Sequence, residues 1–226
     1  MFAAHLAGGV KISYAQQTPA KEPSSPPLHG KKLAEAYCAG CHGVDGSTTS
    51  DAQYPKLAGQ KAYYIRQQLR AFRSGARKSD IMSGPAAAIS DAQIRELARY
   101  FSDQRVKPDK VNPLLARDGA RIFRYASRRA PACISCHGRG GYGRGGMMGG
   151  RGMGGMAGMM GRGHKGMMMG NSAAIPNLYG QHAAYTVKQL DAFAGGARRG
   201  TVMGPIAASL SRQARRAVAE YLAGLR

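Results

Sequence analysis

The stretch Cys38-Ala39-Gly40-Cys41-His42 occurs a second time, as Cys133-Ile134-Ser135-Cys136-His137, and the two copies use all four cysteines of the chain. A C-x-x-C-H run is typical of c-type haem attachment. Two thiols three residues apart on a helical turn point to the same side, where each can bond a haem vinyl group while the adjacent histidine reaches the iron. The duplicated run therefore predicts two covalently attached haems, with His42 and His137 as iron ligands.

Two other uses of a C-x-x-C pair compete with this interpretation. Such pairs also form redox disulfides and halves of zinc sites. Four-coordinate zinc needs further cysteines, histidines or carboxylates at ligand spacing, and none follows either run. A redox disulfide gives no role to the histidine that follows the second cysteine in both copies. The haem interpretation explains both the histidine and the duplication, and we favour it.

The second half of the chain repeats the first. Many residues recur 121 positions later, whereas the haem motifs are only 95 positions apart, so the second copy holds 26 more residues between its motif and Pro176. This internal duplication predicts two domains. The matching pairs are Pro55 and Pro176, Leu57 and Leu178, Gly59 and Gly180, Tyr64 and Tyr185, Leu69 and Leu190, Phe72 and Phe193, Arg77 and Arg198, Met82 and Met203, Leu97 and Val218, and Tyr100 and Tyr221.

The methionines suggest a second axial ligand for each iron. Of the twelve, one is Met1, nine lie between residues 147 and 169, and the other two are Met82 and Met203, at matching repeat positions in loops before the last expected helix of each domain. A loop methionine is often only a core gap-filler. The matched pair instead predicts thioether ligands, as in many electron carriers. Six-coordinate irons would disfavour substrate binding at the metal, which argues against an enzyme.

A ligating histidine normally donates its other ring proton to an acceptor that fixes the ring. Pro55 and Pro176 each open a P-x-L-x-G-Q segment and are candidates to offer a backbone carbonyl to His42 and His137, although a proline in this place also suits a simple turn. Five further residues are candidate contacts of the haem propionates, which the sequence does not separate from packing or solvated charge. These are Tyr63, Tyr64, Tyr185, Arg77 and Arg198.

Hydrophobic periodicity predicts an all-α fold. A short helix over 31–37 leads into the first haem motif, and residues 61–74 carry an apolar stripe of Ile65, Leu69 and Phe72. Ser90-Asp91-Ala92-Gln93 is a capping-box start. The helix that follows has one apolar face, made of Ile94, Leu97, Ala98 and Phe101.

The formal net charge is +21 and the sequence pI is near 10.4. Such an excess of positive charge gives information about binding partners and not about the fold. In a haem protein, such charge would steer docking to acidic redox proteins. We expect no nucleic-acid partner, because Trp is absent and no groove-reading motif occurs. The sequence contains no run of 18 or more apolar residues, so it predicts no membrane-spanning helix. The weak apolar segment in residues 1–16 resembles a poorly started export signal, and we expect a periplasmic protein, with peripheral association to the inner membrane surface as a hypothesis.

Together these residues resemble the dihaem cytochrome c4 family. The segments C-A-G-C-H-G, P-K-L-A-G-Q-K-A-Y-Y-I-R-Q-Q-L, D-I-M-S-G and I-S-D-A-Q-I-R-E-L-A-R-Y-F carry the resemblance in the first half. In the second half R-A-P-A-C-I-S-C-H-G and P-N-L-Y-G-Q-H-A-A-Y-T-V-K-Q-L-D-A-F carry it. The resemblance implies a tandem pair of helical cytochrome c domains related by a pseudo-twofold axis, each around one covalently bound haem. It also implies ligation of one haem by Cys38, Cys41, His42 and Met82, and of the other by Cys133, Cys136, His137 and Met203.

We expect the following organisation. Residues 1–28 form a disordered leader with a signal remnant, and residues 29–103 form cytochrome c domain 1. A linker at 104–116 leads to cytochrome c domain 2, at 117–226. Domain 2 contains a tract at 138–170 that is rich in Gly, Met and Arg and departs from the family pattern. This tract suits a neutral flexible loop. A sharper hypothesis is that its thioethers and His164 bind Cu(I), or that its charge docks an acidic partner.

These observations favour a one-electron carrier between respiratory donors and a terminal oxidase or similar acceptor, with no catalytic residues. One alternative is a relay cytochrome subunit of a dehydrogenase complex, which would co-purify with its partner. Another is a dihaem enzyme such as a peroxidase, which would need one iron to lose its methionine.

Overall fold

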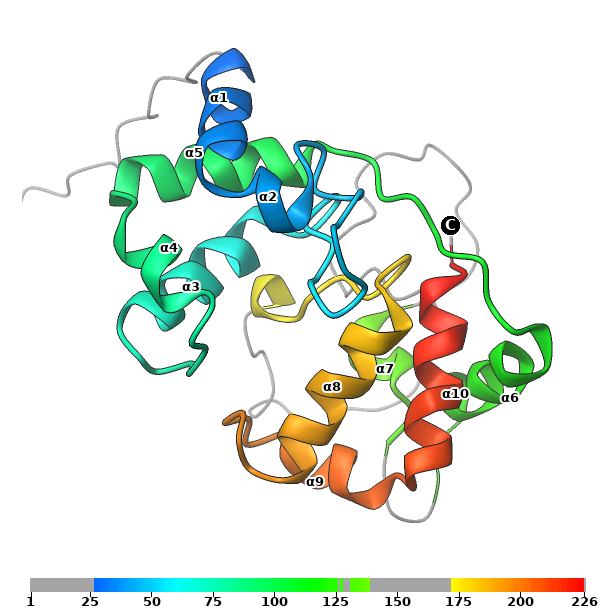
Figure 1. Ribbon diagram of the computed structural model, residues 1–226. Coiled ribbons are helices and arrows are strands. Elements are labelled where there is room, and N and C mark those ends of the chain that lie inside the picture. Colours follow the sequence, from blue (N-terminus) through cyan, green and yellow to red (C-terminus); the bar gives the residue numbers. More distant parts are fainter. Residues whose placement is uncertain (1–26, 126, 128–130, 139–171, 226) are drawn as a thin grey trace, which may run out of the picture.

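The structure is a computed structural model that describes residues 27–125, 127, 131–138 and 172–225. Within these ranges the regular structure is helical and includes no β-strand, which confirms the expected all-α class. Figure 1 shows α1–α5 in one half of the molecule and α6–α10 in the other, joined by an extended segment. The helices are α1 (Pro27–Tyr37), α2 (Ala39–His42), α3 (Ala62–Arg73), α4 (Ser83–Ala87), α5 (Asp91–Ser102), α6 (Pro113–Arg124), α7 (Ile134–His137), α8 (Ala183–Ala194), α9 (Met203–Ser209) and α10 (Arg212–Ala223), with a 3-10 turn η2 (Ser172–Ala174).

Helices α1, α3 and α5 enclose the core of the first half. Helix α5 starts at the expected capping box, where the Gln93 N–H donates to Ser90 Oγ and the Ser90 N–H donates to Gln93 Oε1. Helix α1 approaches α5 closely at Gly30, where a Cβ would lie 2.7 Å from the Cβ of Tyr100. The buried core residues are Leu33, Ala34, Ile65, Ile89, Ile94, Leu97, Ala98 and Phe101.

Helices α6 and α10 form the matching pair in the second half. Their backbones meet at Gly119, where a Cβ would come within 1.9 Å of the Ala217 carbonyl oxygen, so only glycine fits. A Cβ on Gly119 would also lie 2.9 Å from the Cβ of Tyr221, which matches Tyr100 in the repeat. The two halves are therefore built on the same helix crossing, although the sequence around Gly119 does not indicate it.

Helix α6 begins inside the span predicted as a linker. Asn112 Oδ1 accepts the N–H groups of Leu114 and Leu115 at 3.0 and 3.2 Å, and Pro113 occupies the first helical position, where its missing N–H costs nothing. The predicted linker of 104–116 thus overlaps the first turn of this helix.

Asp109, in the connecting segment, forms hydrogen bonds with residues of both halves. Its carboxylate accepts from Lys56 Nζ at 2.6 Å and from His182 Nδ1 at 2.7 Å. The Lys56 side chain is only 3% exposed, so its ammonium group depends on this partner for neutralisation.

Arginine side chains cross between the halves in a repeat-related pattern. Arg77 donates to the Tyr185 hydroxyl at 3.0 Å and to Gln189 Oε1 at 2.8 Å, while Arg198 donates to the Tyr64 hydroxyl at 2.8 Å. Arg198 also reaches Gln68 Oε1 at 3.2 Å. The tyrosine and glutamine that Arg77 contacts are the repeat equivalents of those that Arg198 contacts. The two halves are therefore related by a local pseudo-twofold axis.

Candidate haem sites

The first C-x-x-C-H run forms a single helical turn. The His42 N–H donates to the Cys38 carbonyl at 2.9 Å, so Cys38, Cys41 and His42 are held on one compact turn around α2. Both thiols are free of disulfide bonds. Gly43 ends the turn with a φ of 70°, and a Cβ there would lie 2.3 Å from the Thr48 carbonyl oxygen.

The second run has the same local form. The His137 N–H donates to the Cys133 carbonyl at 2.9 Å, and Gly138 ends the turn of α7 with a φ of 74°. Cys133 and Cys136 are again free thiols. Each run therefore presents two unpaired thiols and one histidine from a rigid turn, which is the donor set that covalent haem attachment requires.

A backbone carbonyl orients each histidine ring. His42 Nδ1 donates to the Pro55 carbonyl at 2.8 Å, and His137 Nδ1 donates to the Pro176 carbonyl at 3.3 Å. These contacts fix the tautomer, because the nitrogen that faces a carbonyl must carry the proton. The lone pair of each ring is thereby assigned to Nε2.

The Nε2 atoms are not sealed inside the protein. Among the described residues, Asn177 Oδ1 is the only fully buried side-chain oxygen or nitrogen without a hydrogen-bond partner. The Nε2 atoms of His42 and His137 also have no hydrogen-bond partner among the described residues, yet they are not among the fully buried atoms. Each Nε2 is therefore accessible, although the two residues are only 4% and 7% exposed. Burial also lowers the pKa of both rings, against the opposing effect of the carbonyl contacts. Neutral imidazole rings with an accessible Nε2 lone pair are suited to coordinate the iron of a haem.

Burial affects the thiols at the start of the two runs. Burial raises the pKa of the Cys38 thiol to about 11 and also raises the pKa of Cys133. The described residues contain no group of three or more His, Cys, Asp or Glu side chains that could hold a metal ion, so they give no support to a zinc site.

The two methionines lie on elements separate from the histidine turns. Met82 directly precedes α4 and Met203 is the first residue of α9, where loops were expected, and both side chains are half-buried. The Met82 N–H donates to Ser79 Oγ at 3.1 Å. The two residues occupy equivalent places in the two halves, as their matching repeat positions imply.

Sequence reasoning missed two glutamines that lie beside the histidine contacts. Gln60 donates to the Asn177 carbonyl and accepts the Asn177 N–H, both at 2.9 Å. Gln181 does the same to Lys56, at 2.9 and 2.8 Å. Both glutamines end the P-x-L-x-G-Q segments, so the repeat contained the signal, but their contacts cross between the halves and required the structure.

Of the residues predicted as propionate contacts, Arg77, Arg198, Tyr64 and Tyr185 meet at the boundary of the two halves. No carboxylate contacts either arginine among the described residues. Tyr63 takes no part in these hydrogen bonds, and the Arg66 guanidinium lies 5.8 Å from the centre of its ring.

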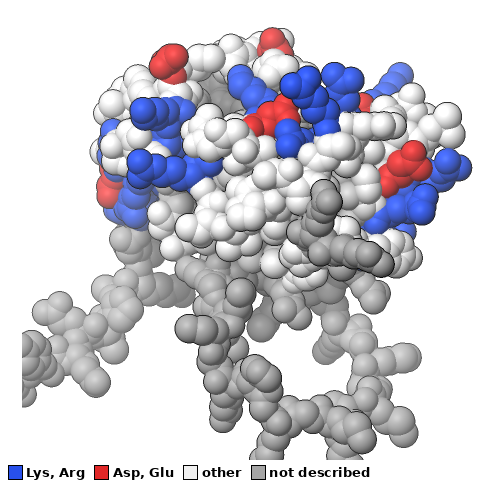
Figure 2. Space-filling view, turned by 90° about the horizontal axis from the view of Figure 1, so that it is seen from below, with Lys and Arg blue, Asp and Glu red and all other residues white. Residues whose placement is uncertain are grey.

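The surface carries the charge that the composition predicts. Figure 2 shows lysine and arginine side chains in groups at the left, at the right and along the upper edge of one face, whereas the lower middle of the described surface is largely uncharged. No helix among the described residues is long and apolar enough to span a bilayer. The hypothesis of a Cu(I) site concerns residues 139–170, which lie outside the described part of the chain.

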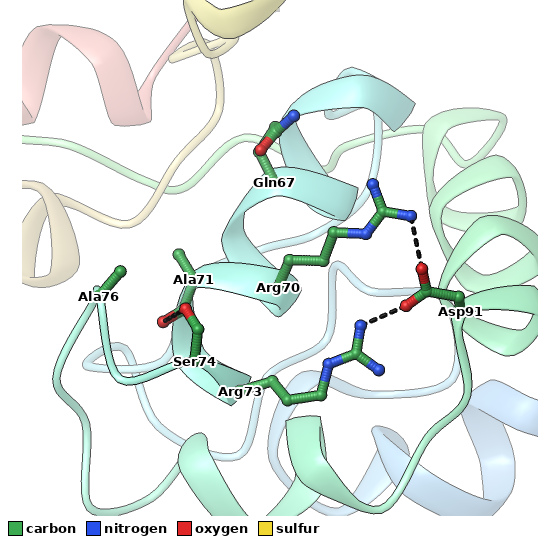
Figure 3. A pocket seen from close by; sticks show the side chains of 7 residues that line it. All are labelled: Gln67, Arg70, Ala71, Arg73, Ser74, Ala76 and Asp91. Atoms are coloured by element: carbon green, nitrogen blue, oxygen red, sulfur yellow. Dashed lines mark hydrogen bonds and ion pairs between the residues drawn. The ribbon is translucent and has the colours of Figure 1, made fainter.

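A shallow hollow on the first half is separate from the haem motifs. Figure 3 shows that α3 and the start of α5 line it, with Arg70 and Arg73 both directed at Asp91. Arg70 Nη2 lies 2.8 Å from the carboxylate, and Arg73 also contacts it. The arginines are thus already paired, and none of the predicted haem ligands lines this hollow.

Comparison with known proteins identifies the family. The family model described as cytochrome c matches residues 28–104. Cytochrome c4 of Stutzerimonas stutzeri is 33% identical over 205 residues, which cover 84% of this chain and 85% of that protein. The chain belongs to the cytochrome c4 family.

Two further comparisons agree with this membership. The crystal structure of reduced recombinant cytochrome c4 from Pseudomonas stutzeri matches with a TM-score of 0.72 and 31% identity, covering 90% of this chain and 100% of that one. A protein of Thiomonas intermedia (strain K12) named thiosulfate dehydrogenase electron acceptor is 34% identical over 198 residues, or 83% of this chain and 78% of that protein.

The family resemblance noted in the sequence is therefore confirmed. The chain consists of tandem cytochrome c domains with covalently bound haem, two per chain as in its cytochrome c4 relatives. It is a one-electron carrier and not an enzyme.

Proposed function

We propose that His42 and Met82 would ligate the iron of one haem, attached through Cys38 and Cys41. His137 and Met203 would then ligate the other haem, attached through Cys133 and Cys136. The observation that carries this assignment is the repeat-related histidine geometry: two buried neutral rings, each fixed by a proline carbonyl, each with a free Nε2. The matched positions of the two methionines support the remaining ligands.

The bound haem iron supplies reversible exchange of one electron between its ferrous and ferric states. The protein keeps the imidazoles neutral by burial and prevents their rotation through the Pro55 and Pro176 carbonyls. If a methionine also ligates each iron, no coordination position would stay open for a substrate. This arrangement favours electron transfer over chemistry at the metal.

The assignment can be tested with M82A and M203A variants of the holoprotein. Each should still contain two haems per chain, since the cysteines are intact, and each should bind carbon monoxide at one ferrous haem. A variant that binds none would show that the replaced methionine is not a ligand.

For the partners, we propose acidic redox proteins in the periplasm. The net charge of +21 favours electrostatic steering toward acidic faces. Covalent haem attachment through paired cysteines suits the exported side of the bacterial membrane, and the same charge suits its anionic surface. A terminal oxidase or a similar acceptor would complete the route.

A second candidate is a relay role beside a dehydrogenase. It is favoured by the relatives named thiosulfate dehydrogenase electron acceptor, at 34% identity in both Thiomonas intermedia and Stutzerimonas stutzeri. Rapid reduction of this protein by a thiosulfate dehydrogenase in the presence of thiosulfate would support that role, whereas no reduction on mixing would exclude this donor.

A further inference from the structure

One peptide group in the first domain contacts both halves of the molecule. The Pro55 carbonyl accepts from His42 Nδ1 at 2.8 Å. The N–H of the same peptide group belongs to Lys56 and donates to Gln181 Oε1, in the second domain, at 2.8 Å. His42, the peptide group and Gln181 therefore form one continuous chain of hydrogen bonds across the domain boundary.

The second domain contains the repeat-related chain. The Pro176 carbonyl accepts from His137 Nδ1 at 3.3 Å, and the N–H of that peptide group, which belongs to Asn177, donates to Gln60 Oε1 at 2.9 Å. Each histidine is thus connected to a glutamine of the other domain through a single peptide group.

The direction of these hydrogen bonds follows from their chemistry. A backbone N–H can only donate, so the glutamine atom that faces it must be the carbonyl oxygen. The glutamine amide nitrogens then donate to the Lys56 and Asn177 carbonyls, both at 2.9 Å, which fixes the side-chain orientation from a second point. Both glutamines are 8% exposed, so water competes little for these bonds.

We propose that Gln181 tunes and positions the haem ligand His42, and that Gln60 does the same for His137, each from the opposite domain. This inference rests on the proposed axial ligands. An acceptor on the peptide N–H polarises the peptide group and makes its carbonyl a stronger acceptor, because hydrogen bonds in series strengthen one another. A stronger acceptor gives the imidazole more anionic character, which favours the ferric iron and lowers the reduction potential.

Removing the glutamine acceptor should therefore raise the potential of the haem in the other domain. We expect a change of about threefold in the reduction equilibrium, or about 28 mV at about 59 mV per tenfold for one electron. The effect should be larger for Gln181 than for Gln60, because the histidine bond that it supports is 2.8 Å long and the other is 3.3 Å.

The domain boundary should persist in such variants. The arginine contacts from Arg77 and Arg198 remain, and Asp109 still joins Lys56 to His182. A single glutamine substitution therefore removes that glutamine's bonds to the opposite domain and its bond from the next N–H of its own chain segment, and leaves these other cross-domain contacts in place.

The experiment uses the two-haem protein with Q181M and Q60M, which keep the side-chain length and remove the hydrogen bonds. A redox titration is followed through the methionine methyl resonances of the two haems, assigned with M82A and M203A. We expect Q181M to raise the potential of the His42 haem and Q60M to raise that of the His137 haem, so each variant is the matched control of the other. Q181E keeps an acceptor for the Lys56 N–H and should not raise the potential of the His42 haem.

Three outcomes would overturn the inference. These are a shift at the haem in the substituted glutamine's own domain, equal shifts at both haems, and no shift. A rise at the His42 haem in Q181E equal to that in Q181M would also contradict it. Failure of the proposed ligands would be seen separately, since M82A and M203A would then leave both methionine resonances in place.

Discussion

The two methionine segments differ in their anchoring, and we expect an added ligand to displace Met203 more readily than Met82. In the first domain, Ser79 Oγ accepts the Met82 N–H at 3.1 Å, and the Ser83 hydroxyl donates to the Ser79 carbonyl at 2.6 Å. These two bonds close the turn that carries the methionine.

The second domain has glycine at both equivalent positions, Gly200 and Gly204. It keeps the backbone bond between them, at 2.8 Å, but cannot form either side-chain bond. Two lost hydrogen bonds contribute about 1 kcal/mol each, and each glycine adds about 0.5 kcal/mol of backbone entropy. The total of about 3 kcal/mol corresponds to about 100-fold in the opening equilibrium of the Met203 segment.

Imidazole binding to the ferric holoprotein measures this difference. Two affinities should be resolved from the loss of the methionine-to-iron charge-transfer band, with the tighter one at the second haem. The S79G/S83G variant should bring the affinity of the first haem close to that of the second, whereas S102G, at the end of α5, should change neither. Equal affinities in the unmodified protein, or an unchanged first haem in S79G/S83G, would refute this reasoning.

Three other perturbations have clear expected results. G119A should lower the free energy of unfolding by about 3 kcal/mol in guanidinium titrations, because its Cβ would meet the Ala217 carbonyl oxygen at 1.9 Å. Partial burial acts to raise the pKa of Asp45, but hydrogen bonds from Lys107 and from the loop after the first haem motif lower it well below its usual range. The ionised Asp45 carboxylate therefore contributes its full stabilisation above the ordinary carboxyl pKa of about 4, and this contribution is lost as the pH falls toward the lowered pKa. D45N should show less acid destabilisation than the unmodified protein in unfolding curves measured as a function of pH. Stopped-flow electron transfer to an acidic acceptor should slow as ionic strength rises, and a rate indifferent to salt would exclude electrostatic docking.

The parts of the fold that depend on local signals could be predicted from the sequence. Helix α5 begins at Asp91, directly after the N-cap Ser90, because its capping box is complete within four residues, and α3 follows the apolar stripe that includes Ile65. The orienting carbonyls of Pro55 and Pro176 could also be inferred, because each haem motif is followed by the same P-x-L-x-G-Q segment.

Contacts between the domains could not be predicted, because they depend on how the two repeats face one another. Gln60 and Gln181 look like ordinary loop residues until their partners, 117 and 125 positions away, are known. The same holds for Arg77 and Arg198, whose cross-domain partners are 108 to 134 positions distant. The start of α6 differs in kind, since the Asn112-Pro113 cap is visible in the sequence, but a proline near a domain boundary also suits a linker.

The most direct test of the proposed ligation is a carbon monoxide difference spectrum of the fully reduced holoprotein, with haem counted per chain. We predict two haems per chain and no carbon monoxide binding, because the proposed ligation by Met82 and Met203 would leave neither iron an open position. Binding at either haem of the unmodified protein would contradict this account and would indicate an open coordination position.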